Sequence, residues 1–402
     1  MTRPESLYQS PNALAPHYSK FRVGERLLLT GHSHQAWPDC GFAAGSEAWL
    51  DAAQFVDDKW DSAFEKAERV RSGFARLLDD SDGYIALAQN THELVTRLLS
   101  ALPIRERPRI VTTDGEFHTV RRQLDRLEEE GLEIIRVEHV PAASVASRVA
   151  AEVDERTVVA MISSVFFDNA QIVPGLGQIM EACERAGAAL LVDAYHALNA
   201  IPFSLQREGL ERAFVVGGGY KYCQLGEGNC FLRFPRDCEL RPVLTGWYSE
   251  FDTLADPLGR KVQYGAGPGR FAGATYDPTS HYRAAAVFDF FREHGLTPEL
   301  LREVSQHQVG LLARAFDDLD TDPELITRDR EVALDGIGGF LALQTPHASE
   351  LCHHLRALGM FTDYRGAVLR IGPAPYLSDD QLKEAVATLA RAIDSLAQQQ
   401  AP

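Results

Sequence analysis

Two polar residues in the middle of the chain, an aspartate and a lysine, are placed so that they could do chemistry together. Asp193 closes the apolar run LLVD, and Lys221 follows the apolar and glycine-rich run FVVGGGY. Both runs are typical of buried strands, and the carboxyl ends of strands in an open α/β sheet meet at a ligand crevice. The spacing therefore predicts that a carboxylate and an amine face the same crevice.

A lysine amine and a carboxylate are the two groups that pyridoxal 5'-phosphate (PLP) requires from a protein. The amine holds the aldehyde of the cofactor covalently, and the carboxylate keeps the pyridine nitrogen protonated so that the ring accepts electrons. A lysine in a partly dry site also has a lowered pKa and can act as a base at the substrate Cα. The pair predicts PLP as the cofactor, with Lys221 and Asp193 as catalytic residues.

A plainer interpretation is that Asp193 caps a turn and that Lys221 is a surface lysine in a glycine-rich loop. Three glycines, the sequence Tyr-Lys-Tyr and a second glycine-rich turn surround the lysine, which is more than a simple connection needs. The glycines at 217–219 lack the GxGxxG spacing, and no acidic residue follows at the distance of a dinucleotide site. We therefore favour the PLP interpretation.

The elements that must position this pair follow an alternating pattern of short apolar runs and longer helix-periodic segments. This pattern predicts an α/β fold with a mostly parallel sheet covered by helices. The predicted strands are 84–88, 109–113, 157–163, 188–193, 213–217 and 229–234. Helices are predicted at 119–130, at 175–186 with a stop at Gly187, and after Ser378 to close the chain.

The segments DAYHALNA (193–200) and YKYCQLGEGNCF (220–231) resemble those of kynureninases, which belong to the class V aminotransferase branch of fold-type I PLP-dependent enzymes. The resemblance continues collinearly along nearly the whole chain. It implies a large PLP-binding domain at 56–290 and a C-terminal small domain at 291–402. The N-terminal segment, 1–55, is expected to contribute to the small domain.

The resemblance assigns most of the cofactor contacts. His196 is expected to support Asp193 or the phenolic edge of the cofactor, and Tyr220 to contact the phosphate and take part in proton transfer. Phe117 matches the aromatic residue that stacks on the ring, or is a core phenylalanine. Asp168 falls near the ring edge, or is a turn residue.

Two further regions are expected to bind the cofactor phosphate. In the segment QNTHEL, Asn90 and Thr91 stand at a predicted helix N-terminus, which suits a dianion, although either residue could simply be the N-cap. The resemblance gives Trp247 a phosphate contact through its indole. Thr275 is expected to reach the phosphate from a neighbouring subunit, which implies a homodimer with a shared active site.

The substrate is expected to be a small amino acid held by Arg370, which lies in the run VLRI. A guanidinium forms a bidentate pair with an α-carboxylate; an ordinary salt bridge is the alternative. The aryl-binding residues match less well, since GHSHQ stands at 31–35 where the family has glycine-asparagine-serine-leucine-glycine. His32 and His34 in this loop are therefore predicted to contact a different substrate; the alternative is that they are simply solvated.

The implied reaction is hydrolytic cleavage of the Cβ–Cγ bond of kynurenine or a related aryl-keto amino acid, which yields an aryl acid and alanine. The alternatives are an aminotransferase, a cysteine desulfurase, another β-eliminating lyase, or a non-catalytic protein that retains the fold. The region around Lys221 lacks the serine-x-histidine-lysine pattern of desulfurases, and none of the cysteines lies in a glycine- or serine-rich loop.

Composition excludes several other classes of protein. The formal net charge of −17 argues against nucleic acid and anionic membranes as partners. No apolar run approaches the roughly 20 residues of a membrane-spanning helix, and MTRPESLYQSPNAL lacks the apolar core of a signal peptide. The six cysteines show no zinc-site spacing, so that no metal site is predicted. We expect a cytoplasmic enzyme.

Overall fold

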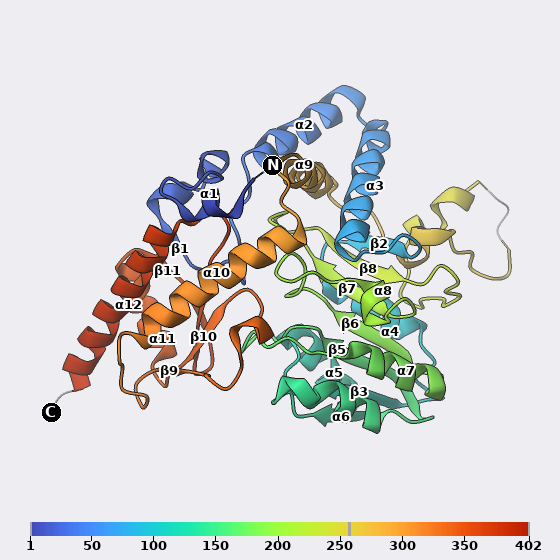
Figure 1. Cartoon of the computed structure of the whole chain (residues 1–402). Coiled ribbons are helices and arrows are strands. Elements are labelled where there is room, and N and C mark those ends of the chain that lie inside the picture. Colours follow the sequence, from blue (N-terminus) through green and yellow to red (C-terminus); the bar gives the residue numbers. More distant parts are fainter. Residues whose placement is uncertain (1, 256–258, 401–402) are drawn as a thin grey trace.

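A seven-stranded sheet forms the centre of the larger part of the molecule in the computed structural model, which describes residues 2–255 and 259–400 (Figure 1). Strand β8 runs antiparallel to both of its neighbours, and the other pairs are parallel. The predicted α/β class with a mostly parallel sheet is confirmed. Across the sheet the strands are β2 (Tyr84–Ala88), β8 (Cys230–Phe234), β7 (Phe214–Gly218), β6 (Ala189–Asp193), β5 (Thr157–Ser163), β3 (Arg109–Thr113) and β4 (Glu133–Val137).

Apolar residues on both faces of this sheet explain why helices cover both sides. Successive side chains of a strand point to opposite faces, so Val111 packs on one side and Ile110 on the other. Helices α3 (Lys59–Leu77), α6 (Val145–Glu152) and α7 (Leu176–Ala186) pack with Val111. Helices α4 (Thr91–Ala101) and α5 (His118–Glu129) pack with Ile110.

The six predicted strands agree with the structure to within one residue at each end. Helix α7 stops at Gly187, which takes the left-handed conformation with φ +67° and donates its N–H to Cys183 O. Strand β4 was not predicted. Its sequence, EIIRV, alternates between buried and more exposed positions at the edge of the sheet, a weaker signal than a continuous apolar run.

A second, smaller part is built around a four-stranded antiparallel sheet. Its strands in order are β12 (Asp363–Arg365), β13 (Val368–Ile371), β10 (Leu341–Gln344) and β9 (Thr327–Arg328). Strand β1 (Leu27–Leu28) pairs with β11 (Met360–Phe361), so the N-terminal segment lies against the C-terminal one (Figure 1). The helices of this part are α1 (Pro4–Tyr8), α10 (Pro298–Asp317), α11 (Ala348–Ala357) and α12 (Asp379–Gln400).

The remaining elements are two longer helices and several short ones. Helices α2 (Cys40–Phe55) and α9 (Thr279–His294) pack against each other, and α3 also packs on α9. The short elements are α8 (Leu205–Glu208) and the 3-10 helices η1 (Ala15–Tyr18), η2 (Val23–Glu25), η3 (Ala142–Ser144), η4 (Trp247–Thr253), η5 (Gly267–Phe271) and η6 (Leu334–Gly336). Within the ranges that the structure describes, none of the helices combines the length and apolar character needed to cross a membrane.

A buried ion pair fixes the antiparallel strand β8 beside β2. Arg233 Nε donates to Asp80 Oδ2 at 2.6 Å, and the two side chains are only 3% and 7% exposed. Arg233 Nη1 also donates to the carbonyl oxygens of Glu211 and Ala213. Burial alone would raise the pKa of Asp80, but the hydrogen bond and charge of Arg233 outweigh it and lower that pKa. Asp80 therefore stays ionised inside the protein.

Replacement of Asp80 by alanine should destabilise the protein by about 3–5 kcal/mol, because it leaves the Arg233 charge buried and unpaired. Urea unfolding of Asp80→Ala at pH 7 measures this loss. The matched control is Asp82→Ala, which removes an exposed ion pair with Arg236 and should cost about 1 kcal/mol or less. Equal effects of the two substitutions would contradict the prediction.

The contribution of Asp80 to the stability of the fold should fade as the pH falls below about 4, because a carboxyl with a lowered pKa stabilises the fold only while ionised.

Candidate active site

A cavity of about 240 Å³ opens at the carboxyl edge of the large sheet. It is lined by residues at or just beyond the ends of β2, β3, β5, β6 and β7, as expected for ligand sites in this class of sheet. The structure thus brings together the predicted residues Asn90, Thr91, Phe117, Asp193, His196, Tyr220 and Lys221.

Lys221 is the central group of this cavity and is 6% exposed. Its Nζ lies 2.7 Å from His196 Nε2 and 4.5 Å from the centre of the Tyr195 ring. The Phe117 and Tyr220 rings lie further out, at 5.5 and 5.8 Å. Burial lowers the pKa of Lys221 to about 7, against the opposing charge of Asp193. A large fraction of the amine is therefore uncharged and nucleophilic at neutral pH.

Asp193 ends β6 beside the lysine. Its Oδ1 accepts a hydrogen bond of 2.8 Å from the backbone N–H of Tyr195. Burial raises the pKa of Asp193 above its usual value, because it outweighs the lowering effects of this hydrogen bond and the Lys221 charge. A protonated ring nitrogen beside Asp193 would lower the pKa of Asp193, as the charge of Lys221 does.

His196 contacts Lys221 rather than Asp193 in this structure. Burial, followed by the charges of Lys221 and Arg370, lowers the pKa of His196 well below its usual value, so the imidazole is neutral. Its Nδ1 is buried and has no hydrogen-bond partner among the described residues. The expected support of Asp193 is not formed here, and the contact with the cofactor's phenolic edge stays a prediction.

Asn90 and Thr91 stand where α4 begins. Asn90 Oδ1 accepts from the backbone N–H of Glu93 at 2.9 Å, so this asparagine is the N-cap. Both residues nevertheless line the cavity, and the positive end of the helix dipole faces it. A helix N-terminus of this kind suits a phosphate.

Asp168 lies outside the cavity lining, although its neighbour Phe167 belongs to it. His139 bridges two carboxylates, with Nε2 at 3.0 Å from Asp168 and Nδ1 at 2.7 Å from Asp114. The Asp168 contact, together with that of Asp114, raises the pKa of His139 to about 9 despite partial burial. The structure therefore places Asp168 in an ion pair, and its cofactor contact stays a prediction.

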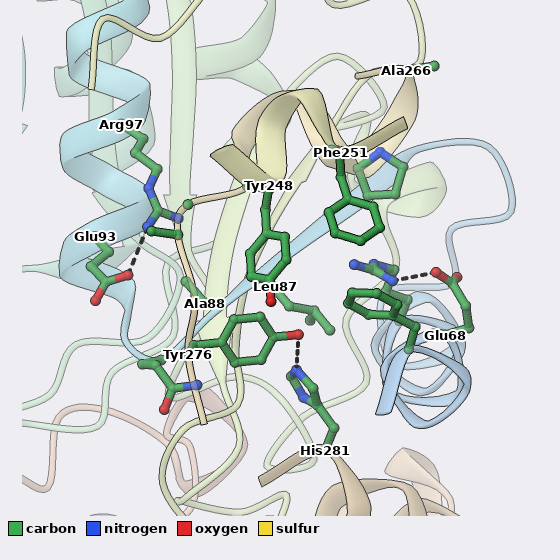
Figure 2. A pocket seen from close by; sticks show the side chains of 18 residues that line it. Glu68, Leu87, Ala88, Glu93, Arg97, Tyr248, Phe251, Ala266, Tyr276 and His281 are labelled. Carbon is green, nitrogen blue, oxygen red and sulfur yellow. Dashed lines mark hydrogen bonds and ion pairs between the residues drawn. The ribbon is translucent and has the colours of Figure 1, made fainter. Parts of the chain in front are cut away.

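Trp247 and Thr275 contact each other away from the Lys221 cavity. Trp247 Nε1 donates to Thr275 Oγ1 at 3.1 Å, and the tryptophan is 41% exposed. Its ring stacks on Tyr248, which lines a second cavity of about 290 Å³ together with Phe251 and Tyr276 (Figure 2). Neither residue lines the Lys221 cavity of its own chain. Their phosphate contacts across a dimer stay predictions.

Arg370 is 2% exposed and is bound to an internal carboxylate. Its Nε and Nη2 donate to Asp363 at 2.9 and 2.6 Å, and its Nη1 donates to Phe167 O at 2.5 Å. Arg370 therefore forms an ordinary salt bridge, which was the alternative to binding a substrate α-carboxylate. Sequence reasoning missed Asp363, because its position opposite Arg370 follows from the pairing of β12 with β13.

The two loop histidines lie in different surroundings. His32 is fully buried, and its Nε2 lies 2.7 Å from Asp363 Oδ1. His34 is exposed and stacks on Tyr220 at 4.8 Å between ring centres. His34 therefore lies next to Tyr220, which lines the cavity. His32 instead contacts Asp363, the partner of Arg370. Contact of either histidine with a substrate stays a prediction.

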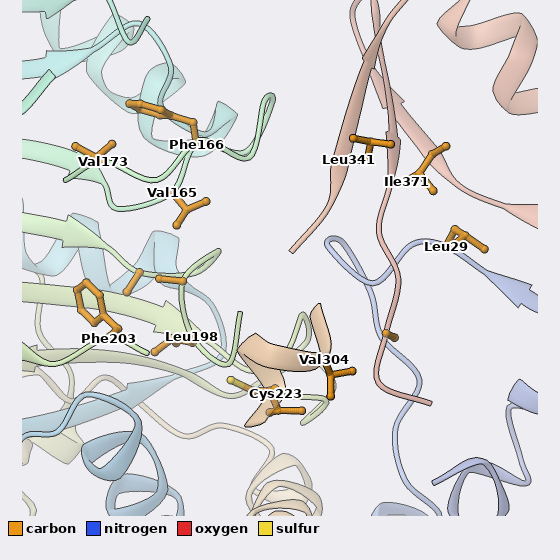
Figure 3. Packing of buried hydrophobic residues seen from close by; sticks show 14 of the residues in the cluster. Leu29, Val165, Phe166, Val173, Leu198, Phe203, Cys223, Val304, Leu341 and Ile371 are labelled. Carbon is orange, nitrogen blue, oxygen red and sulfur yellow. The ribbon is translucent and has the colours of Figure 1, made fainter. Parts of the chain in front are cut away.

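One apolar core joins the part that carries Lys221 to the part that carries Arg370. Phe166 and Leu198 come from the large part, and Leu341 and Ile371 from the small one (Figure 3). The continuous core holds the two parts of the molecule in a fixed relation.

Comparison with known proteins finds distant relatives over most of the chain, while no family model matches. An uncharacterized aminotransferase of Bacillus subtilis, YcbU, is 22% identical over 91% of this chain and 96% of its own length. Isopenicillin N epimerase of Streptomyces clavuligerus is 25% identical, over 82% and 84%. Kynureninase of Xanthomonas campestris pv. campestris is 26% identical, over 80% of each chain.

Solved structures resemble the whole fold. A mutant of C-DES with glycine covalently linked to its PLP cofactor has a TM-score of 0.80 at 16% identity, covering 93% of this chain and 98% of that one. The apo cysteine desulfurase of Thermococcus onnurineus NA1 has a TM-score of 0.77 at 16% identity, over 92% and 95%. The chain has the fold of the fold-type I PLP-dependent enzymes. Among these, its named relatives are of the kynureninase and class V aminotransferase kind.

The cavity fits PLP by its own chemistry. It offers an uncharged buried amine, a carboxylate held by a backbone N–H, a helix N-terminus for a phosphate and an aromatic ring. Tyr195 adds the ring closest to the Lys221 amine. Sequence reasoning missed Tyr195, although it lies inside the DAYH motif.

We expect the rate at which the protein binds added PLP covalently to rise with pH through about 7. The lowered pKa means that Lys221 is protonated and unreactive below this value and uncharged above it. Visible absorbance, recorded after mixing between pH 5.5 and 9, measures the rate. A rate that still climbs at pH 9 without levelling off, as expected for a lysine with the usual pKa of 10.5, would contradict the assignment. Lys221→Ala should give no band, and the exposed Lys383→Ala should behave as wild type.

Proposed function

We propose that this chain is a PLP-dependent enzyme that hydrolyses the Cβ–Cγ bond of an aryl-keto amino acid related to kynurenine. The products are an aryl acid and alanine. The observation that carries the proposal is the buried Lys221 amine facing Asp193 in a cavity built from the kynureninase-like motifs. Kynureninase relatives aligned over most of their length support the choice of reaction.

The residues that would hold the cofactor come from separate elements. Lys221 would bind the aldehyde, Asp193 the ring nitrogen, and the N-terminus of α4 with Asn90 and Thr91 the phosphate. Phe117 would lie along the ring. When bound, PLP supplies an electron sink that stabilises negative charge at the substrate Cα.

The proton transfers would fall to Lys221 and Tyr220. Lys221, as an uncharged amine, would remove the proton from the substrate Cα. Neutral His196, with Nε2 at 2.7 Å from Nζ, would orient the amine by accepting a hydrogen bond from it. Burial raises the pKa of the Tyr220 hydroxyl to about 12, so Tyr220 stays a proton donor at neutral pH. Water added to the γ-carbonyl then completes the cleavage into acid and alanine.

Arg370 remains the proposed anchor for the α-carboxylate. A guanidinium has five N–H groups, and the hydrogen bonds to Asp363 and Phe167 use three of them. One N–H remains on each terminal nitrogen. These two groups match the two oxygens of a carboxylate.

The cysteines favour this hydrolase over a desulfurase. Cys230 is the sole cysteine among the residues described as lining the Lys221 cavity, and burial raises the pKa of its thiol to about 12. Cys352 lies in α11 and donates to Thr362 O. A desulfurase that passes sulfur to its own cysteine requires a reactive thiolate, which burial disfavours in Cys230.

Product analysis separates the candidate reactions. The PLP-loaded protein should convert kynurenine or 3-hydroxykynurenine into an aryl acid and alanine in equal amounts, measured by chromatography. We expect Lys221→Ala to lower kcat by about 100-fold or more, and Lys383→Ala to leave it unchanged. Sulfide from cysteine, or amino-group transfer from alanine to a keto acid as the main activity, would refute the hydrolase. A wild-type protein that never acquires a PLP absorbance band would refute the enzyme itself.

A further inference from the structure

We propose that Glu116 is a positioning residue of this site: its carboxyl, buried without a cation, ties the ends of β3 and β5 together next to the strand end that carries Asp193. This inference rests on the proposed PLP dependence and adds a residue that neither the motifs nor the relatives assign.

Glu116 is 4% exposed and is held from two strands. Thr113 Oγ1, at the end of β3, donates to its Oε1 at 2.7 Å. Ser163, at the end of β5, donates its backbone N–H to Oε1 at 3.1 Å and its hydroxyl to Oε2 at 2.6 Å. No Lys or Arg pairs with this carboxyl among the described residues. A carboxyl buried without a cation is unusual and calls for an explanation.

Asp193 lies on the neighbouring strand at the same level. Ser163 of β5 and Asp193 of β6 are register partners, so their backbones run about 4.8 Å apart. Ser164 strengthens this junction, since both its N–H and its hydroxyl donate to Asp193 O, at 2.9 and 3.1 Å. Through Ser163, the Glu116 carboxyl is attached to the same strand ends that present Asp193 to the cavity.

The two carboxyls are unequal in their partners. Asp193 has the charge of Lys221 and a backbone N–H to stabilise its ionised form. Glu116 has two hydroxyls and one N–H, and a hydroxyl can turn to accept a hydrogen bond from a protonated carboxyl. Burial, with a smaller contribution from the Asp193 charge, raises the pKa of Glu116 to about 7. Glu116 has no cation beside it, so its uncharged form persists up to about pH 7.

The same anchor positions an aromatic residue. Phe117 follows Glu116 directly and stands at the start of α5. Its ring makes a perpendicular contact with Phe167 at 5.5 Å and lies 5.5 Å from Lys221 Nζ. Fixing Glu116 on β5 therefore fixes the backbone from which Phe117 enters the cavity.

Thermal unfolding against pH tests the buried ionisation directly. A Glu with a raised pKa keeps its proton in the folded state between about pH 4.5 and 7 while the unfolded chain loses it, so stability falls as the pH rises through this window. Glu116→Gln carries no such charge. The Tm of this variant minus that of wild type should therefore increase by about 2 °C or more from pH 5 to pH 8. Glu155→Gln, at an exposed position, should show a constant difference.

Catalysis by the PLP-loaded variants tests the positioning role. Glu116→Gln keeps the uncharged form and should hold kcat within about threefold of wild type, with an unchanged visible band. Glu116→Ala should lose about tenfold or more in kcat and alter the band, because Ser163 and Phe117 lose their anchor.

Two outcomes would overturn the inference. One is a Tm difference for Glu116→Gln that stays constant with pH, and the other is a loss of kcat in Glu116→Gln as large as in Glu116→Ala. The Tm measurement reports on the ionisation of Glu116 whether or not PLP is bound. A wild type that binds no PLP would refute the proposed function, while a flat Tm difference in a yellow, active protein would refute the role of Glu116 alone.

Discussion

The removal of one amine from water is the constraint on which this site depends. A buried ammonium is costly, so burial lowers the pKa of Lys221 to about 7, and a large fraction of the amine is uncharged at neutral pH. Aromatic rings surround the amine, a neutral imidazole touches it, and the opposing charge of Asp193 limits the shift. The hairpin of β7 and β8 delivers the lysine to this place, because its turn lies at the carboxyl edge of the sheet.

The sheet and the centre of the site were predictable from sequence because their signals are local. Buried strands read as continuous apolar runs, and six of the seven strands in the large sheet were found in this way. Asp193 and Lys221 each follow such a run directly. Parallel strands bring their carboxyl ends to one edge, so local patterns were enough to predict that two residues far apart in sequence are neighbours.

The surroundings of the site were less predictable because they depend on strand register and on the packing of loops rather than on local patterns. Asp363 meets Arg370 through the register of β12 and β13, and Asp168 meets His139 from a loop 29 residues further along the chain. Glu116 looked like an ordinary acidic loop residue, and its burial follows from the approach of β5 to β3. Trp247 and Thr275, expected at the phosphate, contact each other away from the Lys221 cavity of their own chain, a placement that no local pattern indicates.

The guanidinium of Arg370 is already desolvated, oriented and held by three acceptors before any ligand arrives. Folding has thus met the entropic cost of immobilising a long side chain, and under the proposed function an incoming carboxylate would meet a rigid fork. Such preorganisation favours recognition by shape over recognition by charge alone. A substrate whose carboxylate is tilted or displaced would find the fork unable to follow it, so selectivity at this end of the substrate would be set by angle.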